Sequence, residues 1–200
     1  MLSDSQIDRY SRQIVLAEIG GRGQERLLRS AVTVRGGADA ALVCASYLAG
    51  AGVGVVALED VSSGAMASIL ALETRNPDCR IVEHAVVACD LLVAIGSPGK
   101  FHVPATPVVW GGGTPDTLSS AYFPSEEACA SCLADVARRE DRGGASPQIL
   151  GALLAVEALR VLLGLAAKDR PTLRSLDLRR AAATSLPFPF RSDCRCRKSS

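Results

Sequence analysis

The sequence has almost no net charge and no long hydrophobic run. Its 200 residues contain 22 Lys and Arg against 21 Asp and Glu, a formal net charge of +1, so we expect no basic field that would attract nucleic acid. Gly, Arg or Asp interrupts the apolar stretches before they reach the roughly 18 residues of a membrane span, and residues 1–6 are polar, unlike a signal peptide. We therefore expect a cytoplasmic protein that binds neither nucleic acid nor a membrane.

The sequence also lacks an even set of cysteines. Seven cysteines in a chain without a secretion signal argue against a disulfide framework. Three stand singly in or beside apolar segments, where a free cysteine is usually a small buried hydrophobic residue: Cys44, Cys79 and Cys89. The other four form two pairs, Cys129/Cys132 and Cys194/Cys196. Four soft ligands are the usual number for a tetrahedral structural zinc, so these four are the candidate zinc ligands.

Hydrophobic spacing predicts an α/β protein. Short apolar runs bounded by Gly, Pro or Asp predict strands at residues 31–34, 53–58, 79–83, 91–95, 107–110, 119–123 and 173–178. Helical spacing predicts helices at residues 5–16, 22–30, 38–50 and 148–164. The last helix is apolar almost all round, which indicates burial in the core or across a dimer interface. Residues 138–146 have the composition of an exposed loop, and residues 187–200 contain little that is apolar.

Residues 31–58 read as strand, tight turn, helix and strand, the opening of a Rossmann-like unit with a mainly parallel sheet and flanking helices. Gly36 and Gly37 form the turn, and Asp60 follows the second strand, at the carboxyl edge where such sheets bind ligands. A chain of this length and 48% hydrophobic content forms one core. We expect a single domain, 1–200: N-terminal helices (1–30), Rossmann-like core (31–123), and a last part (124–200) with the cysteine pairs, the apolar helix and a zinc-pinned tail.

Motifs spread along the chain resemble those of a known family. They lie at residues 9–16 (RYSRQIVL), 47–54, 75–77, 129–133, 157–160 and 193–194. On these motifs the chain resembles the ThiF/MoeB/HesA group of the ubiquitin-activating-enzyme superfamily, which adenylates the C-terminal glycine of ubiquitin-like or sulfur-carrier proteins. The resemblance implies a nucleotide site at Gly36, Gly37 and Asp60, zinc at the two cysteine pairs, and a dimer. In that dimer Arg12 would reach the nucleotide of the opposite subunit.

The nucleotide loop departs from the family pattern. The family's Gly-x-Gly-x-x-Gly is here Gly36, Ala38 and Ala41, with Asp39 between the alanines. The second glycine lets the backbone approach phosphate and the third lets the helix pack close to the strand, so each added methyl opposes that geometry. A carboxylate at a helix N-terminus competes with phosphate for the same N–H groups. The loop therefore predicts weak nucleotide binding.

Other residues of the family's chemistry are missing as well. No Lys or Arg stands between Asp60 and Arg75, where the family holds the triphosphate, and the magnesium-binding Asp aligns with Ser97. A hydroxyl does not replace a carboxylate as a ligand for a hard cation. Residues 133–193 contain no cysteine for thioester or persulfide transfer. The second zinc pair is one residue shorter than the family's, and His84 and His102 stand alone, which favours structural roles.

These departures favour a catalytically degenerate family member that alone binds neither ATP nor Mg²⁺. It would act as the non-catalytic partner, in a homodimer or heterodimer, of an active subunit working on a ubiquitin-like or sulfur-carrier protein, and would lend Arg12. The alternative is an active adenylyltransferase in which Arg35, Lys100 or a partner's residues replace the missing cations. A nicotinamide-dependent oxidoreductase ranks last, because the altered glycine loop opposes it equally.

Overall fold

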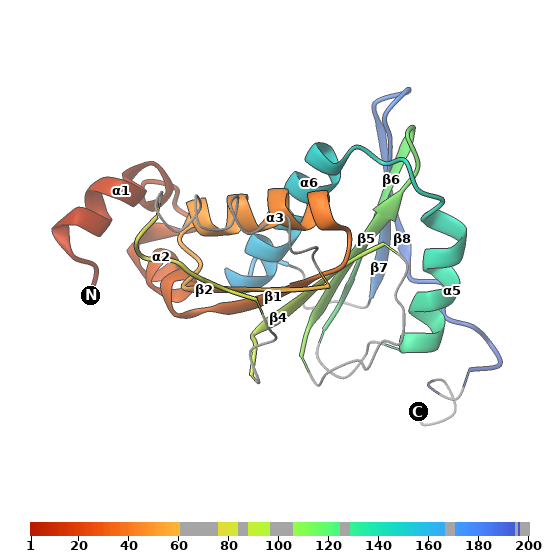
Figure 1. Ribbon diagram of the computed structural model, residues 1–200, viewed down its shortest axis with the longest axis horizontal. Helices are drawn as coiled ribbons and strands as arrows, with labels where there is room; N and C mark the ends of the chain where they lie inside the picture. The colour runs from red at the N-terminus through yellow and green to blue at the C-terminus, as the bar shows by residue number, and fades with distance from the viewer. Residues whose placement is uncertain are drawn as a thin grey trace.

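The chain forms an α/β structure around one mixed sheet (Figure 1), and we describe it from a computed structural model. The structure describes residues 1–60, 76–83, 88–96, 106–124, 129–166, 171–194 and 196. The strands are β1 (Ala31–Arg35), β2 (Val55–Glu59), β3 (Arg80–Val82), β4 (Leu91–Ile95), β5 (Val108–Gly113), β6 (Thr117–Phe123), β7 (Thr172–Asp177) and β8 (Ala182–Pro187). The helices are α1 (Asp4–Ile14), α2 (Gly20–Arg29), α3 (Ala38–Ala51), α5 (Ala130–Glu140) and α6 (Pro147–Leu162).

Within the described residues the sheet has eight strands in the order β3-β2-β1-β4-β5-β6-β7-β8. The first five pair in parallel and the last four pair antiparallel, with β5 belonging to both groups. The fold class expected from the sequence, a Rossmann-like and mainly parallel sheet with flanking helices, is confirmed. The carboxyl ends of β1, β2, β4 and β5 share one edge, which is where such a sheet binds its ligand.

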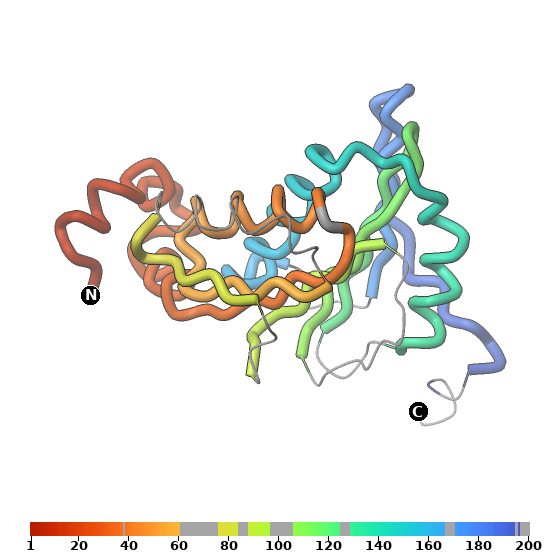
Figure 2. The backbone as a smooth tube through the Cα atoms, viewed as in Figure 1, coloured from red at the N-terminus to blue at the C-terminus, as the bar shows by residue number. Residues whose placement is uncertain are grey.

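Helices cover both faces of the sheet, and β4 shows how the sequence provides for this. Leu91, Val93 and Ile95 join the core under α3 and α6, while Leu92 and Ala94 join a second core under α5. Successive side chains of a strand point to opposite faces, so a strand covered on both sides is apolar throughout. Figure 2 follows the backbone from the N-terminal helices at one end of the molecule to the C-terminal segment near α5.

The entry motif is explained by a buried hydrogen-bond network. Tyr10 of α1 is only 1% exposed, and its hydroxyl donates to Asp78 Oδ2 (3.0 Å) and accepts from Asn76 Nδ2 (2.9 Å). The Asn76 amide also donates to the Ala49 carbonyl, 2.6 Å away, near the end of α3. A side chain at Gly52 would meet the Tyr10 ring at 2.7 Å. The motif residues therefore fix α1 against the C-terminal end of α3.

Glycines in β5 misled the sequence prediction of that strand, which ended at Trp110. The strand continues through three glycines to Gly113. A Cβ at Gly111 would lie 2.5 Å from a methyl of Leu154 in α6, and one at Gly112 would lie 2.7 Å from Cβ of Asp141. The glycines do not break the strand; they let α6 and the segment after α5 approach its backbone closely.

One further expectation is wrong, and one strand was not predicted. Residues 138–140 are not exposed loop but the last turn of α5, which the sequence analysis missed because its arginines and glutamate suggested a loop. Strand β8 was missed because all six of its residues are exposed and show no alternation. The segment after it does pack: the ring of Phe188 is 3% exposed and lies 4.6 Å from the ring of Phe123. The contact between Phe188 and Phe123 thus anchors the segment after β8, whose composition is mostly polar.

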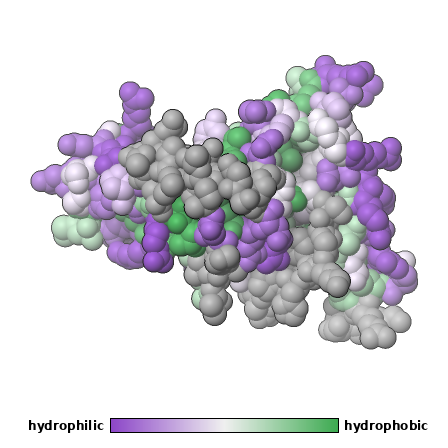
Figure 3. Space-filling model, viewed as in Figure 1, coloured by the Kyte–Doolittle hydropathy of each residue, from purple (hydrophilic) through white to green (hydrophobic). Residues whose placement is uncertain are grey.

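Hydrophilic residues dominate the surface at both ends of the molecule, over α1 and over the β7–β8 hairpin and α5 (Figure 3). Hydrophobic residues show between these ends. Among the described helices, none combines the length and the apolar character that a membrane crossing needs.

Candidate functional site

The four paired cysteines lie together where α5 begins. The Sγ atoms of Cys129, Cys132, Cys194 and Cys196 are all within 4.8 Å of one another. The Sγ atoms of Cys129 and Cys194 are 3.5 Å apart, and those of Cys132 and Cys196 are 3.8 Å apart. Thiolates bound tetrahedrally at about 2.3 Å lie about 3.8 Å from one another. The cluster is therefore consistent with a zinc site, and the shortened Cys-x-Cys spacing fits it.

The surroundings of the cluster act on its thiols in opposite directions: some contacts favour the thiolate, whereas burial raises the pKa of Cys132 and of Cys196. Cys129 is the N-cap of α5, so the positive end of the helix faces the sulfurs, and the backbone N–H of Arg191 donates to Cys132 Sγ over 3.5 Å. A backbone N–H from Cys196 lowers the pKa of Cys194 to about 7. Burial raises the pKa of the Cys132 thiol to about 11. A bound divalent cation would offset that burial cost, because it holds its thiolates deprotonated.

Gly36 and Gly37 form the turn between β1 and α3 that the sequence predicts. Both have left-handed backbone angles, φ +81° at Gly36 and +53° at Gly37, and Gly37 caps α3. A Cβ at Gly36 would lie 2.6 Å from the Ile95 carbonyl oxygen, so the turn also depends on the close passage of β4. The Gly36 N–H donates to the Glu59 carbonyl over 3.1 Å, which brings the end of β1 beside the end of β2.

Asp60 lies at the same edge as the glycine turn. It is exposed and has φ +58°, a left-handed conformation that aspartate tolerates better than most residues. The residue before it, Glu59, forms an ion pair with Arg35 at the end of β1. Arg35, the cation directly before the turn in the sequence, is therefore already paired with a carboxylate. Asp39, exposed in the first turn of α3, adds a further negative charge.

Ala41, at the third glycine position of the family loop, is fully buried in the core beneath α3 and α6. The fold thus accommodates this methyl, so Ala41 alone is a weaker argument against a nucleotide than the sequence suggested. Five other positions named in the sequence analysis lie outside the described residues: Arg75, His84, Ser97, Lys100 and His102.

Arg12 lies far from the turn of its own subunit. It is exposed in the last turn of α1, and within the described chain its side chain has no ion-pair or hydrogen-bond partner. Helix α1 is fixed to the C-terminal end of α3 through Asn76 and Ala49, whereas Gly37 lies at the N-terminal end. Because α3 has 14 residues, about 21 Å of helix separates Gly37 from the end of α3 to which α1 is fixed. The structure does not bring Arg12 to Gly36, Gly37 and Asp60.

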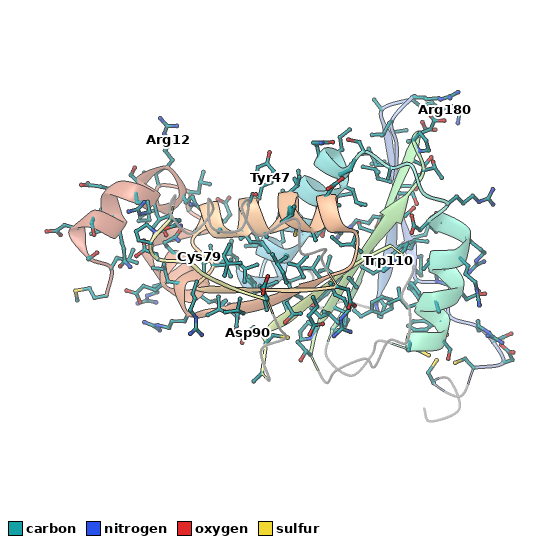
Figure 4. The ribbon with its side chains drawn as sticks, in the orientation of Figure 1. Arg12, Tyr47, Cys79, Asp90, Trp110 and Arg180 are labelled. Atoms are coloured by element: carbon teal, nitrogen blue, oxygen red, sulfur yellow. The ribbon has the colours of Figure 1, made fainter. Side chains whose placement is uncertain are left out.

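Helices α1, α3 and α6 enclose an open groove of about 380 Å³ near Arg12. Its floor is made of small residues, and its rim carries the exposed apolar side chains of Tyr47 (58% exposed) and Val156 (55% exposed). Val15 and Leu16, also exposed, follow α1 directly. Figure 4 shows Arg12 and Tyr47 on the same side of the molecule, both pointing away from the sheet. We name this the α1/α3/α6 face.

A second groove was not predicted from the sequence. It is lined by arginines of α2 and lies at the amino ends of the parallel strands, opposite the edge that holds the glycine turn. Arg22, Arg26 and Arg29 follow one another at i, i+4 and i+7, a spacing that puts them on one helix face. The spacing alone indicates a positively charged helix face. The net charge of the chain, which is close to zero, does not reveal this local concentration of positive charge.

Known proteins are similar to this chain in sequence and in fold. A stretch of 59 residues, 30% of the chain, is 49% identical to "Adenylyltransferase and sulfurtransferase MOCS3" of Aedes aegypti and covers 14% of that protein. The protein of the same name in Drosophila grimshawi is 28% identical over 221 aligned positions, covering 82% of this chain and 48% of the relative. The "SAMP-activating enzyme E1" of Haloferax volcanii is 44% identical over 59 residues, 30% of this chain and 22% of that protein. The chain thus matches at most about half the length of these relatives.

Solved structures agree on the fold. E. coli MccB crystallised with ATP superposes with a TM-score of 0.71 at 15% identity, over 94% of this chain and 74% of MccB. PaaA superposes with a TM-score of 0.68 at 17% identity, over 94% of this chain and 85% of PaaA. No protein-family model matches the chain.

Proposed function

We propose, because the chain belongs to the ThiF/E1-like adenylyltransferase family, that it serves as the non-catalytic partner of an active adenylating subunit. The substrate of the pair would be a ubiquitin-like or sulfur-carrier protein, the class on which this family acts. The chain would work as a single domain, residues 1–200, in the cytoplasm. Its contribution would be a pairing surface and one arginine supplied to the partner's nucleotide.

The observation that carries the proposal is the charge at the carboxyl edge of the sheet. Asp39 occupies the first turn of α3, where a phosphate would need backbone N–H groups, and the guanidinium of Arg35 is paired with Glu59. The described part of this edge therefore offers a phosphate carboxylates rather than a free cation. Adenylation depends on neutralising the charge of the phosphates, so this edge is poorly suited to the reaction.

The α1/α3/α6 face supports the pairing role. It gathers exposed apolar side chains around a groove, as a surface that becomes buried on association does. Arg12 stands beside it, and no described residue pairs with its guanidinium. A second copy of this chain would pair through this face without supplying a nucleotide, whereas an active relative seated on it would bring its own nucleotide toward Arg12. An arginine supplied in trans stabilises developing phosphate charge in the best-studied phosphoryl transfers.

Zinc at the four cysteines would be structural in this proposal. Cys129 and Cys132 belong to the start of α5, and Cys194 and Cys196 to the C-terminal segment, so a bound ion would join the two. A four-thiolate site leaves no open coordination position for catalysis. The ion would hold the C-terminal segment against the second core.

A second candidate is an active adenylyltransferase with an atypical site. It is favoured by the retained turn at Gly36 and Gly37 and by the left-handed conformation of Asp60, since a strained backbone is common at binding sites. The two candidates differ in a simple assay. ATP–pyrophosphate exchange by the pure chain with a carrier protein is expected to be absent for a non-catalytic partner and present for an enzyme.

The test of the first proposal uses the complex. The chain is co-expressed with a complete ThiF/E1-like protein of the same organism, and ATP–pyrophosphate exchange is measured for the purified pair. Arg12→Ala is expected to lower the exchange rate at least about tenfold, whereas Arg142→Ala, which also removes one exposed charge, leaves it unchanged. Equal rates in the two variants, or no stable complex, would remove the proposed role.

A further inference from the structure

The groove beside α2 lies at the amino edge of the parallel strands, and its volume is about 450 Å³. Ser30 immediately precedes β1, Asp90 precedes β4 and Pro107 precedes β5. The glycine turn and Asp60 lie at the other ends of the strands, and a five-residue strand is about 16 Å long. In Figure 4 Asp90 lies below the sheet, away from Arg12 and Tyr47. The groove is thus separate from both surfaces discussed above.

One wall of the groove carries three positive charges. Arg22, Arg26 and Arg29 are exposed on one face of α2, while Gln24 and Leu27 on the opposite face are fully buried. These buried residues anchor α2 to the core, so the backbone that carries the three arginines is held in place beside the groove. Neighbouring arginines one turn apart have Cβ atoms about 5–6 Å from each other.

Two of these guanidinium groups have no partner within the described chain. Arg29 pairs with Glu25 at 3.2 Å, but neither an ion pair nor a hydrogen bond engages the guanidinium of Arg22 or that of Arg26. The planar guanidinium forms paired hydrogen bonds with a carboxylate or a phosphate. These two are available for a ligand.

The other groups in the groove limit what that ligand can be. The carboxylate of Asp90 is already held, since its Oδ2 accepts from the Ala31 N–H over 2.8 Å, and the Ser30 hydroxyl donates to the Arg26 carbonyl over 2.8 Å. Three arginines against this one aspartate leave the lining with a net charge of +2. Pro107, Val161 and Leu162 supply an apolar side. The volume is in the range of small-molecule sites.

We propose that this groove binds a small molecule with two anionic oxygen groups, phosphates or carboxylates, about one helical turn apart. One group would lie on Arg22 and the other on Arg26, with the less polar part of the molecule against Pro107, Val161 and Leu162. Two separate guanidinium groups select for two linked anions, because each forms its own charge-assisted hydrogen bonds. Nothing in this site depends on Arg12 or on the glycine turn.

The test is calorimetric titration of the purified full chain in a buffer without added divalent ions. Tripolyphosphate and glutarate are the probes with two or more anionic groups, and inorganic phosphate and acetate are the matched single anions. We expect at least one of the first pair to bind about tenfold more tightly than its single-anion counterpart, and the better of the two identifies the ligand class. The affinity should fall with added salt, because the contacts are between exposed charges.

Variants locate the binding. Arg22→Gln combined with Arg26→Gln is expected to lower the affinity for the tighter-binding probe by about 10- to 100-fold. Both positions are exposed, so the substitutions should have little effect on folding. The control combines Arg142→Gln with Arg180→Gln, which removes the same net charge from exposed positions elsewhere and should change affinity less than about threefold. An equal loss in both variants, or no binding of either probe at millimolar concentration, would overturn the proposal.

Discussion

At the scale of single residues, two glycines of the same chain have opposite roles. Gly36 has φ +81° and a hypothetical Cβ only 2.6 Å from the Ile95 carbonyl oxygen. Gly50, within α3, has an ordinary helical backbone and open space around it. The same substitution should therefore have opposite effects at the two positions, one governed by steric conflict and one by helix propensity.

Gly36→Ala is expected to destabilise the protein by about 2–4 kcal/mol, since the added methyl meets backbone in a left-handed conformation. Gly50→Ala should stabilise it by about 0.5–1 kcal/mol, the cost of glycine in a helix. Urea unfolding followed by circular dichroism measures both. A loss of stability at Gly50, or none at Gly36, would contradict the described backbone.

Tyr10 gives a prediction for alkaline pH. Burial raises the pKa of its hydroxyl from 10 to about 12. Between these values the unfolded chain has lost the phenol proton and the folded chain has kept it, so the free energy of unfolding falls as pH rises from 10 to 12. The fall assigned to Tyr10 is at most about 3 kcal/mol, since one unit of pKa corresponds to about 1.4 kcal/mol, and solvent screening lowers it.

Tyr10→Phe isolates that contribution. The variant is less stable near neutral pH because it leaves Asn76 and Asp78 without the hydroxyl, but its stability should decline less between pH 10 and 12 than that of the natural chain. Parallel unfolding curves at several pH values test the difference. Identical slopes in the two proteins would show that Tyr10 is not the group that titrates.

At the scale of elements, prediction from sequence succeeded where one physical cause dominates. The strand at residues 91–95 was placed correctly because burial on both faces makes it continuously apolar. The zinc candidates were found because two close pairs of a rare ligand are a chemical signal that does not depend on the fold. Helix α5 and strand β8 were missed because tertiary contacts, such as those of Phe188 with Phe123, decide the structure there.

The cysteine cluster joins two of these elements and predicts how they respond to loss of metal. Cys194→Ser should lower bound zinc from about one ion per chain to almost none and lower Tm on the order of 10 °C, since a few kcal/mol shifts a protein of this size by that much. Elemental analysis and thermal unfolding measure the two effects.

Cys89→Ser is the matched control, because Cys89 is distant in sequence from the cluster and is not among its members. It should keep its zinc and nearly all of its stability. If Cys194→Ser retains the metal, or if the natural chain purified without chelators contains none, the cluster is not the zinc site that we propose.

At the scale of the whole molecule, the sequence predicted the sheet but not its surfaces. The positions of most strands follow from which segments are apolar, whereas a groove depends on the distances between side chains from several elements. The α1/α3/α6 face combines residues 13 to 159, and the arginine groove combines residues 22 to 162. The spacing within α2 indicates a charged helix face; only the folded chain shows that the face borders a hollow.

Association through the α1/α3/α6 face is tested by Val156→Arg. The side chain is 55% exposed, so folding should change little, whereas a charge buried in an interface would abolish pairing. Sedimentation velocity of the chain, alone and with an active relative, is expected to show complexes for the natural chain and none for the variant. Leu186→Arg, at an equally exposed apolar position in β8, should leave association intact; equal behaviour of both variants would place the contact elsewhere.

The position in the chain of the segment that follows β8 has a consequence for biosynthesis. Trp110 and Phe123 are made early, whereas Phe188 and Cys194, which help α5 to cover the same side of the sheet, follow 65 to 84 positions later. A ribosome adds on the order of 5–20 residues per second, so the part of this apolar surface that α5 does not cover stays open for several seconds in each new chain. Chaperone demand during translation should therefore concentrate on the α5 side, and it should end once Phe188 and the last two cysteines have been added.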